Sequence, residues 1–260
     1  MTTAPLDPLA AFRLDGKVAI VTGASSGFGE RFARVLAAVG ASVVVAARRA
    51  ERIDLLAAQL PDALAVPTDV ASEADCERLV AATVERYGRI DVLVNNAGIS
   101  DAPAKAEELD PSSFADVLDV NLHACFVLSR LVAPHMFEQG AGSIVNVASV
   151  HGLVASAPNL QVAYDSSKHG LIGLTRGLAG QWARKGVRVN ALAPGYFETE
   201  LTAAMFEDDA SGLGWIKRNT QMGRAGAVPE LDGALLLLAS EAGSYLSGSV
   251  LTVDGGWTAS

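Results

Sequence analysis

A tyrosine and a lysine stand four residues apart in a segment that predicts a long helix. Tyr164 and Lys168 lie within residues 162–185. Residues i and i+4 of a helix share one face, and a neighbouring ammonium lowers the pKa of a phenol from its free value of roughly 10. The pair can therefore exchange a proton near neutral pH. The alternative is a solvated helix face, where this spacing is common.

Two further polar residues accompany this pair. Ser149 ends a predicted strand, at the carboxyl edge where parallel sheets bind ligands, and its hydroxyl can hydrogen-bond a substrate oxygen. Asn121 lies inside a predicted helix, where asparagine competes with backbone hydrogen bonds. It is either a helix-surface amide or an inward group that relays a proton through water to Lys168. The candidate catalytic set is Asn121, Ser149, Tyr164 and Lys168.

A glycine-rich turn joins the first predicted strand to the first predicted helix. Glycines at such a turn let the backbone approach a pyrophosphate, and the helix start offers free N–H groups. The spacing is Gly-x-x-x-Gly-x-Gly, which differs from the usual dinucleotide fingerprint. The turn predicts a dinucleotide site formed by Gly23, Ser25, Ser26, Gly27, Phe28 and Gly29.

The end of the second predicted strand indicates which dinucleotide binds. An NAD site places an acid there, whereas residues 46–49 read Ala-Ala-Arg-Arg, with no acid before Glu51. Arg48 can bind a 2′-phosphate by paired hydrogen bonds; the alternative is a solvated arginine at a helix start. Asp69 and Val70 follow the third strand and are expected at the adenine edge, although Asp69 could equally be a helix cap. NADP(H) is predicted rather than NAD(H).

Short apolar runs alternate with helical patterns along the chain. The runs are nearly continuous, as in strands covered on both faces, and the alternation predicts right-handed crossovers. We expect one α/β domain over residues 1–260, a doubly wound Rossmann-type fold with a seven-stranded, mostly parallel sheet and helices on both faces. Strands are predicted at 17–22, 42–47, 64–68, 90–94, 143–148, 187–192 and 249–253, and helices at 27–40, 50–60, 72–87, 111–138, 162–185 and 229–240.

Composition excludes several classes of function. The net charge of −9 disfavours nucleic-acid binding. The two cysteines, Cys76 and Cys125, form no ligand-spaced cluster, so neither a metal site nor a disulfide framework is expected. The start of the chain lacks the pattern of a secretion signal, and no apolar run is long enough to span a membrane. A cytoplasmic protein with a small-molecule substrate is predicted.

In order and spacing, these motifs resemble those of the short-chain dehydrogenase/reductase family. The resemblance covers roughly residues 16–257 and is carried by residues 22–29, 95–98, Asn121, Ser149, 164–168 and 194–195. It implies that Tyr164 is the general acid/base and that Ser149 holds the substrate oxygen. It further implies that Lys168 binds the nicotinamide ribose and tunes Tyr164, and that Asn121 completes the proton relay.

The resemblance also assigns cofactor contacts. Asn96, Ala97 and Gly98 are expected to pack beside the cofactor, with Pro194, Gly195, Phe197 and Thr199 near the nicotinamide end. Ser26 stands where many NADP-using relatives carry a basic residue, so the 2′-phosphate contact depends mainly on Arg48. Family members are commonly tetramers, which implies a homotetramer here.

The substrate is the least determined feature of the sequence. Residues about 195–224 interrupt the strand–helix alternation and are interpreted as a lid. The expected pocket favours a mostly apolar ketone and is formed by Ser149, His151, Leu153, Val154, Tyr164, Tyr196, Phe197, Leu201, Met205, Phe206 and Trp215.

Several other functions stay open. A 3-oxoacyl group on an acidic carrier protein is one alternative substrate, although residues 131–143 hold no Lys or Arg and only Arg184 and Lys185 lie near. A sugar or polyol is another. The alternatives of other classes are a non-catalytic NADP-sensing regulator and a lyase or dehalogenase that uses the Ser–Tyr pair without hydride transfer.

Overall fold

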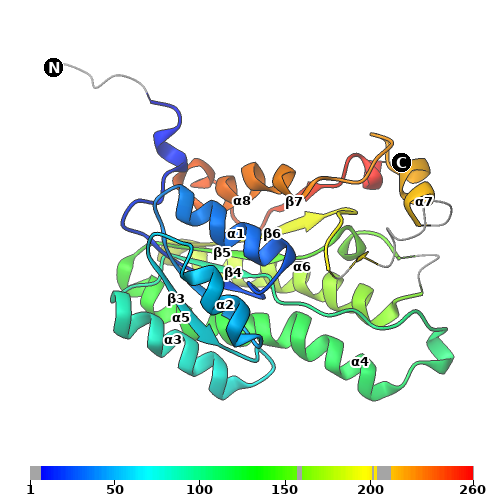
Figure 1. The fold of residues 1–260 in the computed structure, drawn as a ribbon, viewed down its shortest axis with the longest axis horizontal. Coiled ribbons are helices and arrows are strands. Elements are labelled where there is room, and N and C mark those ends of the chain that lie inside the picture. Colours follow the sequence, from blue (N-terminus) through cyan, green and yellow to red (C-terminus); the bar gives the residue numbers. More distant parts are fainter. Residues whose placement is uncertain (1–6, 157–159, 201, 204–211, 260) are drawn as a thin grey trace.

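Seven parallel strands form one sheet in the computed structural model, which describes residues 7–156, 160–200, 202–203 and 212–259 (Figure 1). The strand order is β3-β2-β1-β4-β5-β6-β7. This is the doubly wound α/β sheet that the sequence predicts, with every pairing parallel. The strands are β1 Val18–Thr22, β2 Ser42–Ala47, β3 Ala63–Pro67, β4 Val92–Asn95, β5 Gly142–Val147, β6 Val187–Pro194 and β7 Val250–Val253.

Helices cover both faces of the sheet. One layer holds α1 (Gly27–Ala38), α2 (Ala50–Ala57) and α8 (Asp232–Ala239). The other holds α3 (Glu73–Tyr87), α4 (Pro111–Leu118), α5 (Ala124–Gln139) and α6 (Val162–Trp182). In Figure 1, α1 and α8 lie above the sheet and α3, α4 and α5 lie below it.

Alternate residues of each strand enter different cores. Val21 belongs to the core that contains Phe32 and Leu36 of α1. Ile20 belongs to the core on the other face, with Leu79 of α3 and Leu128 of α5. Fully burying a side chain of this kind contributes about 1.5–3 kcal/mol. Because both faces of the strands are buried, β1, β2 and β4 are apolar at nearly every position rather than at every second one.

The strand order reverses between β1 and β4, which opens a crevice at their carboxyl ends. Hydrogen bonds tie the two strand ends together there. The Thr22 hydroxyl accepts from the backbone N–H groups of Asn96 and Ala97, each at 3.0 Å, and the Asn96 amide donates to the Thr22 carbonyl at 2.8 Å. The glycine-rich turn and residues 95–98 are therefore fixed side by side.

The single helix predicted over residues 111–138 is interrupted. A π-helical turn, Asp119–His123, separates α4 from α5. The wider turn accompanies a fully buried Asn121, whose amide bonds to the backbone of Ile99. Such turns occur mostly inside longer helices and often at functional sites. The predicted start is confirmed, because Asp110 caps α4 and Pro111 is its first residue.

Other element ends differ from the prediction by a few residues. α2 ends at Ala57 rather than at residue 60, and α6 ends at Trp182 with a 3-10 turn, Ala183–Lys185, completing the predicted span. Residues 195–224 include one further short helix, α7 (Gly214–Asn219), beside the C-terminus in Figure 1. Leu201, Met205 and Phe206 of the expected pocket lie outside the described residues.

One helical stretch among the described residues has the length and composition to cross a membrane. It is Pro111–Gln139, with a mean hydropathy of 1.3 over its most apolar window, half of which is buried inside the fold. A core helix passes the same test. Its inner residues, Leu128 and Met136 among them, pack in the core beneath the sheet.

Candidate active site

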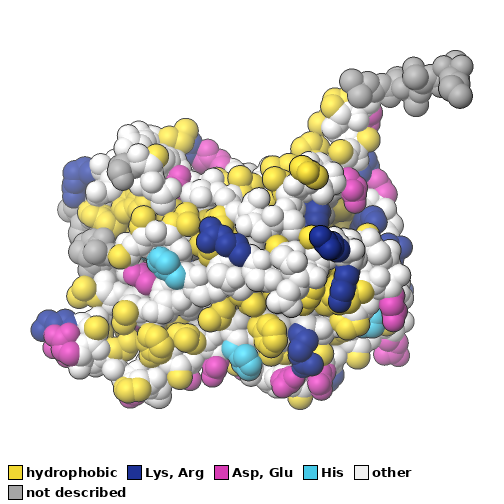
Figure 2. Space-filling view, turned by 180° about the vertical axis from the view of Figure 1, so that it is seen from behind, with side chains coloured by type: hydrophobic (Ala, Val, Ile, Leu, Met, Phe, Trp, Pro, Cys, Tyr) yellow, Lys and Arg dark blue, Asp and Glu magenta, His cyan; other side chains and the backbone are white. Residues whose placement is uncertain are grey.

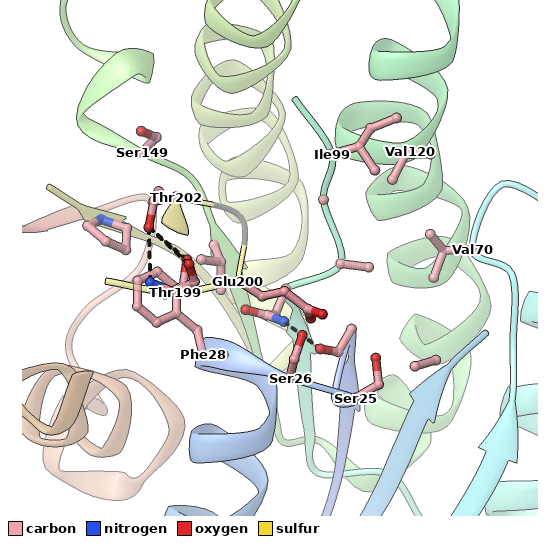
Figure 3. A pocket seen from close by; sticks show the side chains of 18 of the residues that line it. Ser25, Ser26, Phe28, Val70, Ile99, Val120, Ser149, Thr199, Glu200 and Thr202 are labelled. Atoms are coloured by element: carbon pink, nitrogen blue, oxygen red, sulfur yellow. Dashed lines mark hydrogen bonds between the residues drawn. The ribbon is translucent and has the colours of Figure 1, made fainter. Parts of the chain in front are cut away.

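A cavity of about 460 Å³ lies at the carboxyl ends of the strands. Figure 3 shows Ser25, Ser26 and Phe28 on the side of the glycine-rich turn, Ile99 and Val120 across from them, and Ser149 at the far end. The cavity brings together most of the residues predicted for cofactor and catalysis: Gly23, Ser25, Ser26, Gly27, Phe28, Arg48, Asp69, Val70, Asn96, Ala97, Gly98, Ser149, Tyr164, Lys168, Pro194, Gly195, Phe197 and Thr199.

Steric crowding explains two glycines of the turn. A Cβ on Gly23, whose φ is +65°, would lie 2.8 Å from the Ala97 Cα, and a Cβ on Gly29 would lie 2.3 Å from the Gly23 carbonyl oxygen. Gly29 is not part of the cavity wall, so it allows the turn to pack rather than lining the site. Among the described residues, no side chain caps the start of α1, which leaves its N–H groups for a ligand.

Two arginines and two acids line the end of the cavity next to β2. Arg48 is exposed there, and within the described part of the chain its side chain forms no hydrogen bond or ion pair. Arg49, which the sequence interpretation left unassigned, bonds to Ser25, Ser26 and Glu200. Its place in the Arg-Arg pair was an available signal, whereas nothing in the sequence pointed to Glu200.

Asp69 lies in the cavity wall and is not the cap of α3. It lines the cavity together with Val70, and its carboxylate also accepts from the Ala71 N–H at 3.1 Å. The second contact closes a local turn before α3. The helix cap itself is Ser72, whose hydroxyl accepts from the Asp75 N–H at 3.3 Å.

Ser149, Tyr164 and Lys168 meet at the other end of the cavity. The Lys168 ammonium donates to the Val147 carbonyl at 2.8 Å and lies 5.5 Å from the centre of the Tyr164 ring. The Ser149 hydroxyl lies near the Tyr164 phenol, close enough to lower its pKa, and accepts from the His151 N–H at 3.1 Å. The end of β5 and one face of α6 therefore bring the predicted hydroxyl, phenol and ammonium together.

Burial controls the ionisation of these groups. It raises the pKa of Tyr164, and the hydrogen bond from Ser149 opposes this rise. Burial also lowers the pKa of Lys168 to about 8. The direction for Tyr164 is opposite to the one expected from the Tyr–Lys spacing, because burial and the nearby Asp165 carboxylate both disfavour the phenolate. The hydroxyl of Ser149 is the group that favours the phenolate.

Asn121 is an inward residue, and the helix-surface interpretation is wrong. Its side chain is fully buried, accepts from the Ile99 N–H and donates to the Ile99 carbonyl, both at 2.8 Å, and donates to Ser167 at 3.0 Å. A Cβ on Gly98 would lie 3.2 Å from the Asn121 Oδ1 and 3.7 Å from the Lys168 Nζ. Asn121 thus fixes the cavity wall next to Lys168.

The predicted substrate residues His151 and Tyr196 lie behind the cavity wall. Both are buried, and the His151 Nε2 lies 2.9 Å from the Tyr196 hydroxyl. The ring centres of His151 and Tyr164 are 6.2 Å apart. Burial lowers the pKa of His151, and the Asp165 carboxylate opposes this shift. Trp215 of α7 and Trp257 pack against Tyr196 with ring centres 5.4 and 4.7 Å away, closing this side.

A family comparison now identifies the chain. The family described as short chain dehydrogenase matches residues 17–210. The chain belongs to the short-chain dehydrogenase family. The seven-stranded parallel sheet and the order of the motifs along it agree with this membership.

Full-length relatives extend the comparison. Galactitol 2-dehydrogenase (L-tagatose-forming) of Cereibacter sphaeroides is 42% identical over 255 residues, 97% of this chain and 99% of that protein. Gluconate 5-dehydrogenase of Gluconobacter oxydans is 40% identical over 253 residues, 96% and 97% of the two chains. A crystal structure of a gluconate 5-dehydrogenase from Burkholderia cenocepacia, in complex with NADP and tartrate, aligns with a TM-score of 0.92 at 38% identity, covering 98% of this chain and 100% of that one. This short-chain dehydrogenase is therefore an oxidoreductase that acts on CH–OH groups.

The donor groups of this short-chain dehydrogenase fit a nicotinamide dinucleotide. The uncapped start of α1 faces the cavity at the glycine-rich turn, which suits a pyrophosphate. Arg48 and Arg49 suit a phosphate on the adenosine, and Lys168 suits a ribose hydroxyl. Thr199 also lines the cavity, its hydroxyl 3.1 Å from that of Thr202.

A carboxylate that sequence reasoning missed holds the start of α6. Asp101 is buried and accepts from the backbone N–H groups of Ala163 and Tyr164, at 3.2 and 3.0 Å. The first turn of a helix leaves such N–H groups without helical partners, and a carboxylate there also complements the helix dipole. Because Asp101 precedes α6 by some 60 residues, no local pattern predicts this contact.

Proposed function

We propose that this short-chain dehydrogenase interconverts a secondary alcohol and a ketone on a polyol or sugar acid, with NADP(H) as its cofactor. The observation that carries the proposal is the convergence of Ser149, Tyr164 and Lys168 at one end of a cavity whose other end is the glycine-rich turn. The similarity to galactitol and gluconate dehydrogenases supports a sugar or polyol substrate better than the mostly apolar ketone expected from the pocket residues.

Each residue of the site has a distinct proposed role. When bound, the nicotinamide accepts a hydride from the alcohol or donates one to the ketone. In the oxidative direction the Ser149 hydroxyl donates a hydrogen bond to the oxygen of the substrate alcohol. The Tyr164 phenolate accepts the proton of that alcohol. In the reductive direction the Tyr164 phenol donates the proton as charge develops on that oxygen. One oriented donor of this kind typically contributes about 3 kcal/mol to the transition state.

Lys168 and Asn121 support Tyr164 in this proposal. The Val147 carbonyl holds the Lys168 ammonium beside the phenol, where it can bond a ribose hydroxyl and stabilise the phenolate. The Asn121 amide is bonded to Ile99 and Ser167, so it acts on the site by positioning the wall at Gly98. The relay of a proton from Lys168 to solvent past Asn121 remains a prediction.

Polar groups beside Tyr164 suit a hydroxylated substrate. His151 and Tyr196 join in a hydrogen bond next to the phenol, and Trp215 and Trp257 supply aromatic faces. We propose that a bound substrate displaces the wall in front of His151 and Tyr196 and then contacts both residues, and that residues about 195–224 form the lid of this end. A substrate with several hydroxyl groups can use both the polar pair and the ring faces.

The preference for NADP(H) over NAD(H) rests on the end of β2. Arg48 is exposed in the cavity, and the strand ends without a carboxylate to accept from a ribose 2′-hydroxyl. Structures of relatives from Burkholderia cenocepacia and Beutenbergia cavernae are described with NADP bound. These observations support Arg48 as the principal 2′-phosphate ligand.

We further propose a single-domain chain that forms a cytoplasmic homotetramer. Phe126 of α5 is 42% exposed, and Val162 at the start of α6 is 38% exposed. Figure 2 shows apolar side chains over the lower half of one face, the half in which α4 and α5 lie in Figure 1. Exposed apolar surface of this kind suits a contact between identical subunits.

A substrate and cofactor screen tests the function. Purified protein is assayed with galactitol, gluconate and an aromatic secondary alcohol, each with NADP⁺ and with NAD⁺. We expect the highest kcat/KM with a polyol or sugar acid and NADP⁺. Tyr164→Phe is expected to lower kcat by at least about 100-fold while NADPH binding, followed by fluorescence, is retained. A faster reaction of the aromatic alcohol would reject the substrate class, and an active Tyr164→Phe variant would reject the catalytic assignment.

A further inference from the structure

The Glu200 carboxylate lies at the adenosine end of the cavity, where it contacts Arg49 and Arg52, two arginines that follow β2. Its two oxygens accept from the Arg49 Nη1 and Nη2 at 2.8 and 2.9 Å, in a paired geometry. The Arg52 guanidinium lies 3.3 Å away. Glu200 follows β6 and Arg49 follows β2, so the contact joins residues 151 positions apart across the glycine-rich turn. Figure 3 shows Glu200 beside Ser26 at this turn.

The same contact occupies most of the hydrogen-bonding capacity of Arg49. A guanidinium has five N–H donors, and Arg49 uses one on Ser25, one on Ser26 and two on Glu200. A planar guanidinium fork flanked by hydroxyl groups is also the set of donors that a phosphate monoester prefers. A phosphate and the Glu200 carboxylate cannot both accept from this fork, and their like charges repel.

We propose that Glu200 competes with the 2′-phosphate of the cofactor for Arg49, and so sets how strongly the enzyme prefers the phosphorylated dinucleotide. This inference rests on the proposed use of NADP(H). Arg48 binds the phosphate without hindrance, whereas Arg49 becomes available only when Glu200 moves away. Removing the Glu200 charge is therefore expected to tighten the binding of 2′-phosphorylated ligands and to leave unphosphorylated ones unchanged.

Glu200 is ionised throughout the working range of the enzyme. Hydrogen bonds from Arg49 and Ser26 lower the pKa of its carboxyl to about 2. The charge of Glu200 consequently does not change between about pH 5 and pH 9, whereas a 2′-phosphate gains its second negative charge near about pH 6. The pair is about half exposed, which limits its strength, and the expected gain in affinity is about fivefold.

The test is isothermal titration calorimetry of 2′,5′-ADP and 5′-AMP, which differ in the 2′-phosphate. Glu200→Gln is expected to bind 2′,5′-ADP about fivefold more tightly than the parent protein, with 5′-AMP binding unchanged. Glu198→Gln, which removes an exposed charge two residues away, is the matched control and is expected to behave as the parent. If Glu200→Gln binds 2′,5′-ADP no more tightly than the parent does, the inference is overturned. The NADP(H) proposal still stands in that case, provided that the parent prefers 2′,5′-ADP to 5′-AMP. If the parent binds 2′,5′-ADP no better than 5′-AMP, the NADP(H) proposal fails as well.

Substitution of Arg49 tests the same competition independently, with the same two ligands. Arg49→Ala is expected to change 2′,5′-ADP binding little in the parent, because Glu200 already occupies the side chain. In the Glu200→Gln background the same substitution is expected to abolish the gain. Equal losses in the two backgrounds would show that Arg49 is available while Glu200 is present, and would overturn the competition. Thermal unfolding of each variant checks that the fold is retained.

Discussion

The Ser149 hydroxyl has two tasks at the level of single residues. Its single O–H can be donated to the Tyr164 oxygen, which opposes the rise in the phenol's pKa that burial causes, or to the substrate oxygen once a substrate binds. The oxidative reaction needs Tyr164 as phenolate, whereas the reductive reaction needs it as phenol. Oxidation is therefore expected to become faster as pH rises, and reduction as pH falls.

Ser149→Ala tests both tasks together. Loss of the hydroxyl removes a group that stabilises the phenolate, so the pKa of Tyr164 rises further. The pH at which oxidation reaches half its maximal rate is expected to move upward, and kcat to fall by about 100-fold. The measurement is kcat and kcat/KM against pH in both directions, since kcat/KM reports the free enzyme, with Ser149→Thr as the variant that retains a hydroxyl. A pH profile that stays in place when kcat falls would mean that Ser149 only binds substrate.

At the scale of elements, α6 carries Tyr164 and Lys168, and Asp101 fixes where this helix begins. Asp101→Ala removes the acceptor of two N–H groups in its first turn. We expect the free energy of unfolding to fall by about 1 kcal/mol and kcat to fall several-fold, because Tyr164 is itself one of the two donors. Asp110→Ala is the matched control: it removes the cap of α4, away from the cavity, and is expected to cost similar stability without lowering kcat. Equal kcat values in both variants would contradict a positioning role for Asp101.

The elements also show how far sequence reasoning reaches. Local patterns predict the strands, the glycine-rich turn and the start of α4. These patterns are the apolar runs, the spacing of the glycines, and Asp110 before Pro111. The π-helical turn was not predictable in this way, because it accompanies a bond between Asn121 and Ile99, 22 residues away. Asp101 and Glu200 were missed for the same reason. Their partners lie 62 and 151 positions away, and only the folded sheet brings them together.

At the scale of the whole molecule, the two edges of the sheet have different tasks. Ligand groups gather at the carboxyl ends, whereas Asp91 joins three strands at the amino ends. Its carboxylate accepts from the Val18 N–H at 2.9 Å, its own N–H donates to the Val18 carbonyl, and its carbonyl accepts from Ser143. Arg89 forms a paired ion pair with it at 2.7 Å, and Lys17 lies 3.4 Å away. This edge is suited to stability rather than to chemistry.

Asp91 therefore links stability to pH. Burial raises the pKa of its carboxyl, but the hydrogen bonds from Arg89 and Val18 outweigh burial, and the net pKa is lowered. A group with a lowered folded pKa stabilises the fold above its unfolded pKa of about 3.9, and this contribution is lost as pH falls through the folded value. Asp91→Asn is expected to lower the free energy of unfolding by about 1–3 kcal/mol at pH 7, with the difference from the parent shrinking below about pH 4. Urea unfolding of both proteins at pH 7, 5 and 3 measures this difference in the free energy of unfolding. If the difference stays constant across the three pH values, the charge of Asp91 contributes nothing and only its shape matters.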